Sequence, residues 1–89
     1  EISFMQTRVA VMSIIVESPD SVEEINSLLH TFGPYVLGRM GIPYRDKSIS
    51  IISVAVDAPQ NEISSLSGKI GKLKGVSIKT AYSGVVSDE

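Results

Sequence analysis

The chain of 89 residues has no cysteine, no tryptophan and a single histidine. Without cysteine it cannot form a disulfide, a thiolate nucleophile, a CxxC metal site or an iron–sulfur ligand set. One histidine excludes a metal site built from several imidazoles of the same chain, so we expect no metal and no cofactor. No apolar run approaches the roughly 20 residues of a membrane helix, and no signal peptide is recognisable, so we expect a cytoplasmic protein away from membranes.

The composition is that of an ordinary globular protein, with 43% hydrophobic and 20% charged residues, and the length predicts a single domain over residues 1–89. The formal net charge of -2 argues against direct binding of nucleic acid, which depends on neutralising phosphates. There is no GxSxG motif, and a single histidine leaves little to act as a base. We therefore predict no catalytic residues and a protein that is not an enzyme.

The apolar pattern predicts four strands and two helices. We expect strands over residues 8–17, 35–44, 49–57 and 76–83, helices over 22–32 and 59–73, and a frayed tail over 84–89. The first and third strands are apolar at both parities, as central strands are, whereas Gly38, Gly41 and Pro43 place the second strand at an edge. Ser21 and Glu24 have the spacing of a capping box. The order predicts an α+β, ferredoxin-like βαββαβ fold, a four-stranded antiparallel sheet with both helices on one face.

An internal repeat supports this order. Apolar and acidic positions of the first strand and its following turn recur 40 residues later, as Val16-Glu17 and Pro19 do in Val56-Asp57 and Pro59. The apolar positions of the first helix recur 41 residues later in the second helix. Two βαβ halves that differ by one inserted residue explain both shifts.

One face of the predicted sheet has no helix to cover it. The bulkier strand residues at one parity are assigned to the helix side, and the opposite parity holds Val9, Val11, Ile15, Ile49 and Ile51. Contiguous apolar patches mark contact sites, so we predict that these five residues form the subunit interface of a homodimer or homotetramer. The alternative is that the tail or the segment 38–47 folds over this face.

The segment from Gly38 to Arg45 is the most unusual part of the sequence. Its glycines open the backbone, and its arginines and tyrosine offer planar donors and a stacking surface. The candidate effector-binding residues are Arg39, Met40, Gly41 and Tyr44, together with His30 from the first helix. The alternatives are an irregular edge strand protected from aggregation and, for His30, an ordinary surface residue of the helix.

Several short stretches resemble one family of small proteins. These are Ile2-Ser3-Phe4-Met5, Leu28-Leu29-His30, Gly38-Arg39-Met40-Gly41 with Pro43, Leu66-Ser67-Gly68-Lys69-Ile70-Gly71, Gly75-Val76 and Lys79-Thr80. In order and spacing they are similar to the iron-only hydrogenase system regulators, which look like the branch of ferredoxin-like folds that contains ACT domains and the C-terminal domains of nickel-responsive regulators. The resemblance implies a regulatory role, in transcription among other processes, and dimers or tetramers that bind small effectors at their interfaces. The histidines and cysteine of the nickel site have no counterpart here.

Three functions remain open at this point. The first is an ACT-like, homo-oligomeric regulatory module that binds a small effector or a protein partner. The second is an enzyme of the dimeric α+β barrel kind, with His30 or Tyr44 as acid or base in a cavity between subunits. The third is a purely structural subunit that binds a partner.

Overall fold

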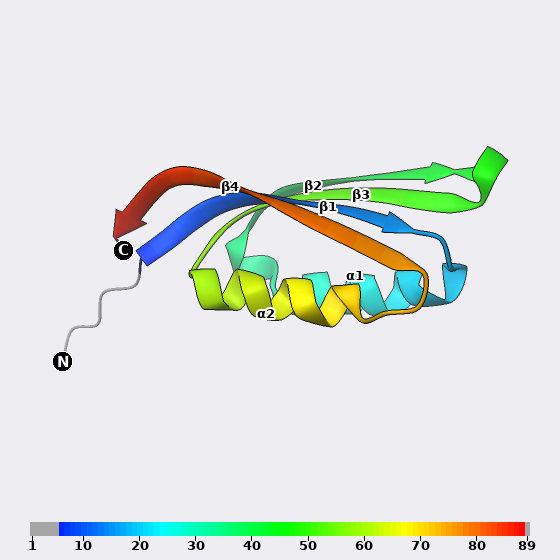
Figure 1. Cartoon of the computed structure of the whole chain (residues 1–89), viewed down its shortest axis with the longest axis horizontal. Helices are drawn as coiled ribbons and strands as arrows, with labels where there is room; N and C mark the ends of the chain where they lie inside the picture. The colour runs from blue at the N-terminus through cyan, green and yellow to red at the C-terminus, as the bar shows by residue number, and fades with distance from the viewer. Residues whose placement is uncertain (1–5, 89) are drawn as a thin grey trace.

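The computed structural model describes residues 6–88 and shows a four-stranded sheet with two helices on one side of it (Figure 1). The strands are β1 (Gln6–Val16), β2 (Val36–Tyr44), β3 (Ile49–Ala58) and β4 (Val76–Asp88). The helices are α1 (Val22–Thr31) and α2 (Gln60–Gly71), and three 3-10 turns complete the chain, η1 (Pro19–Ser21), η2 (Gly33–Tyr35) and η3 (Arg45–Lys47). The strand order is β2-β3-β1-β4 with all neighbours antiparallel, which confirms the predicted ferredoxin-like fold.

The core lies between the sheet and the helices. The strand residues expected on the helix side are all buried there, namely Met12, Ile14, Val16, Ile52, Val54 and Val56. From the helices, Ile25 and Leu29 of α1 and Ile63, Leu66 and Ile70 of α2 are buried against them. The spacing of three to four residues puts these helical side chains on one stripe, which explains why each helix lies flat on the sheet.

The strand β2 forms one edge of the sheet, as its glycines and proline predicted. It pairs only with β3, and every residue after Val36 is exposed. A register shift between Val36 and Gly38 marks a bulge at its start. In Figure 1 the β2–β3 hairpin extends past the helices and ends at η3, so neither side of the hairpin tip is covered by a helix.

The prediction of a frayed tail over residues 84–89 is wrong for residues 84–88, since β4 continues through Gly84 to Asp88. The reason is pairing with the start of β1, where Gln6 is the register partner of Asp88 and Arg8 that of Val86. The ladder shifts register between Arg8 and Ala10, which accommodates the extra residues of β4. Glu89 lies outside the described residues.

The capping box expected from Ser21 and Glu24 does not form. Ser21 precedes α1 without making a side-chain cap hydrogen bond, and its hydroxyl instead donates to the carbonyl oxygen of Lys74 over 2.6 Å. The amide of Glu17 donates to the carbonyl oxygen of Gly75 over 2.7 Å. These two bonds tie the turn before α1 to the turn after α2, so both helices are anchored over the same end of the sheet.

Candidate functional site

The sheet surface away from the helices, called the open face below, is apolar and exposed. The larger apolar residues on it are Val9, Val11 and Ile15 from β1, Met40, Ile42 and Tyr44 from β2, and Ile49 and Ile51 from β3. At its centre, Ile15 is 44% and Ile51 37% exposed. Four residues of the predicted interface are exposed, in agreement with the parity that the sequence predicted, and the fifth, Ile49, is half-buried.

Side chains on the open face lie in rows that run across the strands. One row joins Ile42, Ile51 and Ile15, which are successive register partners on β2, β3 and β1. Two rows further along the strands, Gly38, Ala55 and Val11 are partners in the same way. The open face therefore has a ridge of three isoleucines and, beyond the row of Met40, Ser53, Ser13 and Lys79, a low strip of small residues at Gly38 and Ala55 that ends at the larger Val11.

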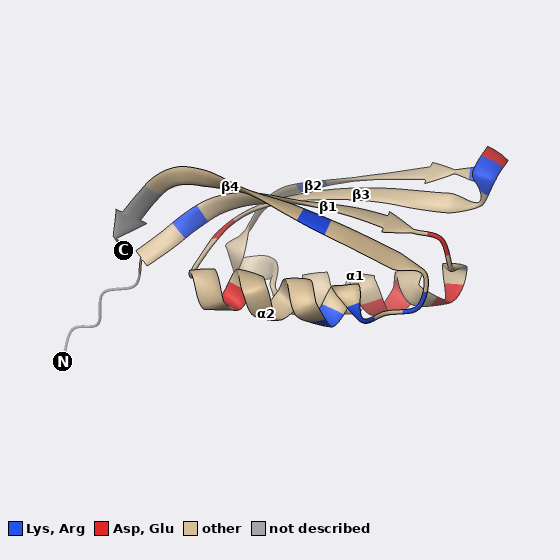
Figure 2. Cartoon of the chain, viewed as in Figure 1, with Lys and Arg blue, Asp and Glu red and all other residues tan. Residues whose placement is uncertain are grey.

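Neither segment that could have folded over the open face does so. Segment 38–44 continues the sheet sideways as part of β2, and residues 86–88 pair with the start of β1. Within residues 6–88 the open face therefore has no cover from the chain itself. Figure 2 shows one Lys or Arg on each of β1, β2 and β4, of which Lys79 on β4 is the register partner of Ser13, and the other charged residues mostly on the helices, in the connecting turns and at η3.

A groove on the other side of β2, called the α1–β2 groove below, separates this strand from α1. Its main cavity has a volume of about 220 Å³, with Asn26 of α1, Arg39 and Gly41 of β2 and Ser50 of β3 in its lining. The chain reverses direction at η2, and α1 and β2 therefore run antiparallel with Asn26 opposite Arg39. The groove exists because α1 leaves the edge strand uncovered, so that β2 is exposed after Val36.

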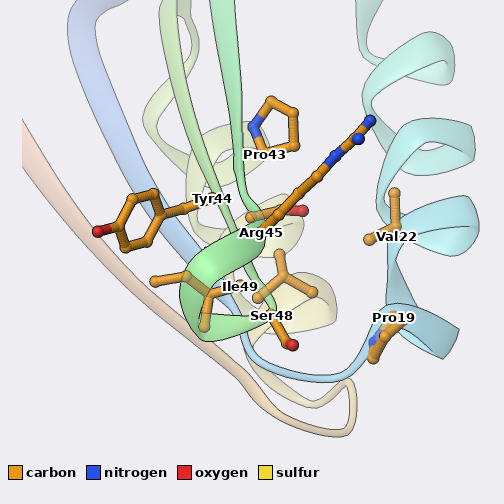
Figure 3. Close-up of a pocket in the computed structure, with 9 residues that line it drawn as sticks. Pro19, Val22, Pro43, Tyr44, Arg45, Ser48 and Ile49 are labelled. Atoms are coloured by element: carbon orange, nitrogen blue, oxygen red, sulfur yellow. The ribbon is translucent and has the colours of Figure 1, made fainter.

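A second cavity of about 190 Å³ continues the groove toward the hairpin tip. It shares Val22, Pro43 and Ser50 with the first cavity and adds Arg45 from η3. Figure 3 shows the Arg45 side chain pointing from η3 toward α1, whereas Tyr44 points the other way. The groove is thus bordered by two arginines from the same hairpin.

Arg39 is held in place by a neutral partner. Its register partner Val54 points into the core, so Arg39 lies on the helix side of the sheet. Its Nη2 atom donates to Oδ1 of Asn26 over 2.8 Å. An amide oxygen orients the guanidinium without neutralising it, and its other N–H groups remain for a ligand.

The structure divides four of the five candidate effector residues between two surfaces. Arg39 and Gly41 lie together in the α1–β2 groove, while Met40 and Tyr44 belong to the open face. His30 is exposed in the last turn of α1, one helical turn beyond Asn26. The assignment of these residues to an effector stays a prediction, and the geometry separates it into a groove part and an open-face part.

Sequence reasoning missed Asn26, Ser50 and Val22 as residues beside the arginines. Asn26 is one of several polar residues in an amphipathic helix, and Ser50 is one of many serines in the chain. Only the antiparallel alignment of α1 with β2 brings them to Arg39. The period of the helix would have placed Val22 and Asn26 on one face, which was the one available signal.

Metal and membrane sites find no support in the part of the chain that the structure describes. Among those residues, no three of the types His, Cys, Asp and Glu are grouped so that they could hold a metal ion. No helix among them is both long and apolar enough to span a membrane.

Comparison with solved structures reveals one close relative and more distant ones of the same fold. The uncharacterized protein TM1266 from Thermotoga maritima superposes with a TM-score of 0.82 at 32% identity, over 85% of this chain and 96% of that one. The apo form of CPII from Thiomonas intermedia K12, a nitrogen regulatory PII-like protein, superposes with a TM-score of 0.60 at 15% identity, over 98% of this chain and 99% of that one. The complex of CPII with ADP, AMP and bicarbonate superposes with a TM-score of 0.53 at 18% identity, over 93% of this chain and 100% of that one.

The distant similarities show the fold alone, which is that of PII-like proteins. No curated protein matches the chain. A family model does match, that of the TM1266-like proteins, described as "Iron-only hydrogenase system regulator, putative", and it covers residues 8–80. With the model spanning most of the sequence and TM1266 itself so similar, the chain belongs to the TM1266-like family of iron-only hydrogenase system regulators.

Proposed function

We propose that the protein is a homo-oligomeric regulatory module in which subunits pack through their open faces and a small effector binds beside β2. The observation that carries this proposal is the exposure of a contiguous apolar surface over β1, β2 and β3. Monomeric proteins rarely leave such a patch in water. The family description supports the regulatory role, and CPII, a regulatory protein of the same fold, binds ADP, AMP and bicarbonate.

Burial supplies the driving force for this association. Moving one valine or isoleucine side chain from water into an apolar contact contributes about 1.5–3 kcal/mol, less for a side chain that is already partly covered. Each subunit brings eight larger apolar side chains to the open face. A set of this size on both subunits can exceed the loss of translational and rotational freedom, which costs about 4–15 kcal/mol.

The relief of the open face suits a second copy of itself. A two-fold axis across the strands, through the row of Ser13 and Ser53, would place the isoleucine ridge of each subunit on the small-residue strip of its partner. In this arrangement Ile51 faces Ala55 of the other copy, and Ile42 faces Gly38. Bulky residues opposite small ones are the arrangement that allows two sheets to interdigitate closely.

Ile15→Lys tests the interface directly. The new ammonium would stand at the centre of the open face, where burial without a partner is costly. We expect the wild type to be an oligomer at micromolar concentration in analytical ultracentrifugation, and I15K to be a folded monomer. Ser64→Lys on the exposed side of α2 is the matched control and should leave the oligomer intact. A monomeric wild type would refute the assembly.

Gly38→Leu tests the proposed arrangement of the two copies. No heavy atom lies within 4 Å of a Cβ placed on Gly38, so a single subunit has room for the larger side chain. Packed against the isoleucine ridge of a partner, the same side chain would collide. We expect G38L to keep its circular dichroism spectrum and to dissociate at concentrations at least tenfold above those at which the wild type does. Unchanged dissociation would contradict this arrangement.

The geometry favours a binding protein over an enzyme. The two residues considered as alternatives for an acid or base lie on different surfaces, His30 on α1 and Tyr44 on the open face. A general acid or base must lie within hydrogen-bond reach of the proton that it transfers, so one cavity could use only one of these two residues.

A further inference from the structure

The α1–β2 groove carries two positive charges at a defined spacing. Arg39 reaches α1 at Asn26, and Arg45 shares a cavity with Val22 and points toward the same helix (Figure 3). Asn26 follows Val22 by four residues, which is one helical turn or about 6 Å along the axis. Both arginine side chains therefore face the first two turns of α1.

Between the arginines the groove is narrow and mostly apolar. Val22 and Pro43 stand on opposite sides of it, with Ile52 and the half-buried Ser50 from β3 at its base. No heavy atom lies within 4 Å of a Cβ placed on Gly41, so the middle of the groove is open to a ligand. Cavities of about 220 and 190 Å³ that share lining residues have room for one small organic ion.

We propose that the α1–β2 groove binds a short aliphatic dicarboxylate, with one carboxylate on Arg39 and the other on Arg45. A guanidinium matches a carboxylate with two parallel N–H···O bonds, and the methylene groups would lie against Val22 and Pro43. Three or four methylenes separate the terminal carbons by about 5–6 Å, close to the rise of about 6 Å between Val22 and Asn26 on α1. A single phosphate could contact both guanidinium groups but would have no methylene groups to lie against Val22 and Pro43. This inference rests on the proposed function in naming the effector that the regulatory module would sense.

The ligand and the partner subunit would use opposite sides of the sheet. The groove lies on the helix side of β2, while Met40 belongs to the open face, as does Ile42 by its register although it also borders the cavity. A dicarboxylate would therefore bind a monomer as well as an oligomer. Binding and assembly can consequently be measured independently, and either can fail while the other holds.

The test is titration calorimetry of the full chain at constant ionic strength with malonate, succinate, glutarate and adipate. Butyrate serves as the single-charge control, and inorganic phosphate and pyrophosphate as the compact anions. We expect affinity to rise along the series to glutarate or adipate and to exceed that of butyrate at least tenfold. Equal affinity for butyrate, tighter binding of phosphate or pyrophosphate, or no heat with any dicarboxylate would each overturn the proposal.

Substitutions assign the binding to the groove. We expect Arg39→Gln and Arg45→Gln each to weaken the best dicarboxylate by about tenfold to a hundredfold, as loss of a charge-assisted hydrogen bond does. Lys47→Gln, which removes the same charge from the same 3-10 turn, is the matched control and should change affinity less than threefold. Equal losses of dicarboxylate affinity in K47Q and R45Q would show that the net charge of the protein alone attracts the ligand, and would overturn the site.

The monomeric variant I15K separates the two proposals. Retained dicarboxylate affinity in I15K supports a site within one subunit. A monomeric wild type that binds dicarboxylate would refute the assembly and keep the site. An oligomer without dicarboxylate affinity would refute the site and keep the assembly.

Discussion

The helix face and the open face of the sheet differ far more in environment than in residue type. Adjacent residues of β1 illustrate this, since Ile14 is 0% exposed and Ile15 is 44% exposed. Both β1 and β3 carry valine and isoleucine at both parities, and two helices are enough to bury one parity only. An apolar pattern at both parities predicts a strand with two covered faces, and within one subunit the helices cover only one of them.

The largest expected effect comes from truncating the same residue type on the two faces. Ile14→Ala removes three carbons from the closed core, and we expect the free energy of unfolding to fall by about 2–5 kcal/mol. Ile15→Ala should cost less than about 1.5 kcal/mol in dilute protein, because its side chain is only partly covered by its own subunit. Chemical denaturation at low and high protein concentration measures both.

The concentration dependence sharpens the comparison. If the open face is a subunit contact, the cost of I15A should grow as the concentration rises, whereas that of I14A should stay the same. Equal and concentration-independent losses for both variants would mean that the two faces are equivalent within one subunit, and the distinction drawn from their exposure would fail.

The second prediction concerns the turns that hold the helices over one face. Gly75 has φ of +69°, and a Cβ at this position would lie 2.8 Å from the Cβ atom of Ser18. We expect Gly75→Ala to destabilise the fold by about 1–3 kcal/mol, from the left-handed backbone and from the close approach together. Thermal and urea unfolding provide the measurement.

Gly68 in α2 supplies the opposite case. No heavy atom lies within 4 Å of its hypothetical Cβ, and it stands inside a helix, where alanine is favoured by about 1 kcal/mol. Gly68→Ala should therefore stabilise the protein. A destabilised G68A would indicate that this surface of α2 has a contact that the single chain does not show.

Much of the fold could be predicted from the sequence because its elements repeat a simple pattern. The spacing of Ile25 and Leu29, and of Ile63 and Ile70, established both helices and their buried sides. The two apolar parities of β1 and β3 placed them in the centre of the sheet. Predictions from local sequence were less reliable where a residue distant in the chain offered a competing hydrogen-bond partner. For this reason Ser21 donates to the carbonyl oxygen of Lys74 rather than capping its own helix.

The extent of β4 and the composition of the groove could not be predicted for a related reason. Residues 84–88 have little apolar pattern of their own and become a strand only by pairing with the start of β1. The sequence singled out Arg39 and Gly41, but alternation along β2 sends Met40 to the other face, which separates residues that are neighbours in the chain. Asn26 joins Arg39 only through the packing of α1 on the sheet.

The smallest expected effect on stability concerns this contact between Asn26 and Arg39. The hydrogen bond is exposed, so Asn26→Ala should change the free energy of unfolding by no more than about 0.5 kcal/mol, as should the control Asn61→Ala on α2. Affinity for the best dicarboxylate should nevertheless fall severalfold in N26A alone, because the guanidinium of Arg39 loses the partner that orients it. Calorimetry on both variants separates the two roles. Equal affinity in N26A and N61A would mean that Arg39 needs no orientation, whereas a large loss of stability in N26A would mean that the contact belongs to the core. A side chain that contributes little to folding and much to binding is what distinguishes a groove kept for a ligand from a gap left by packing.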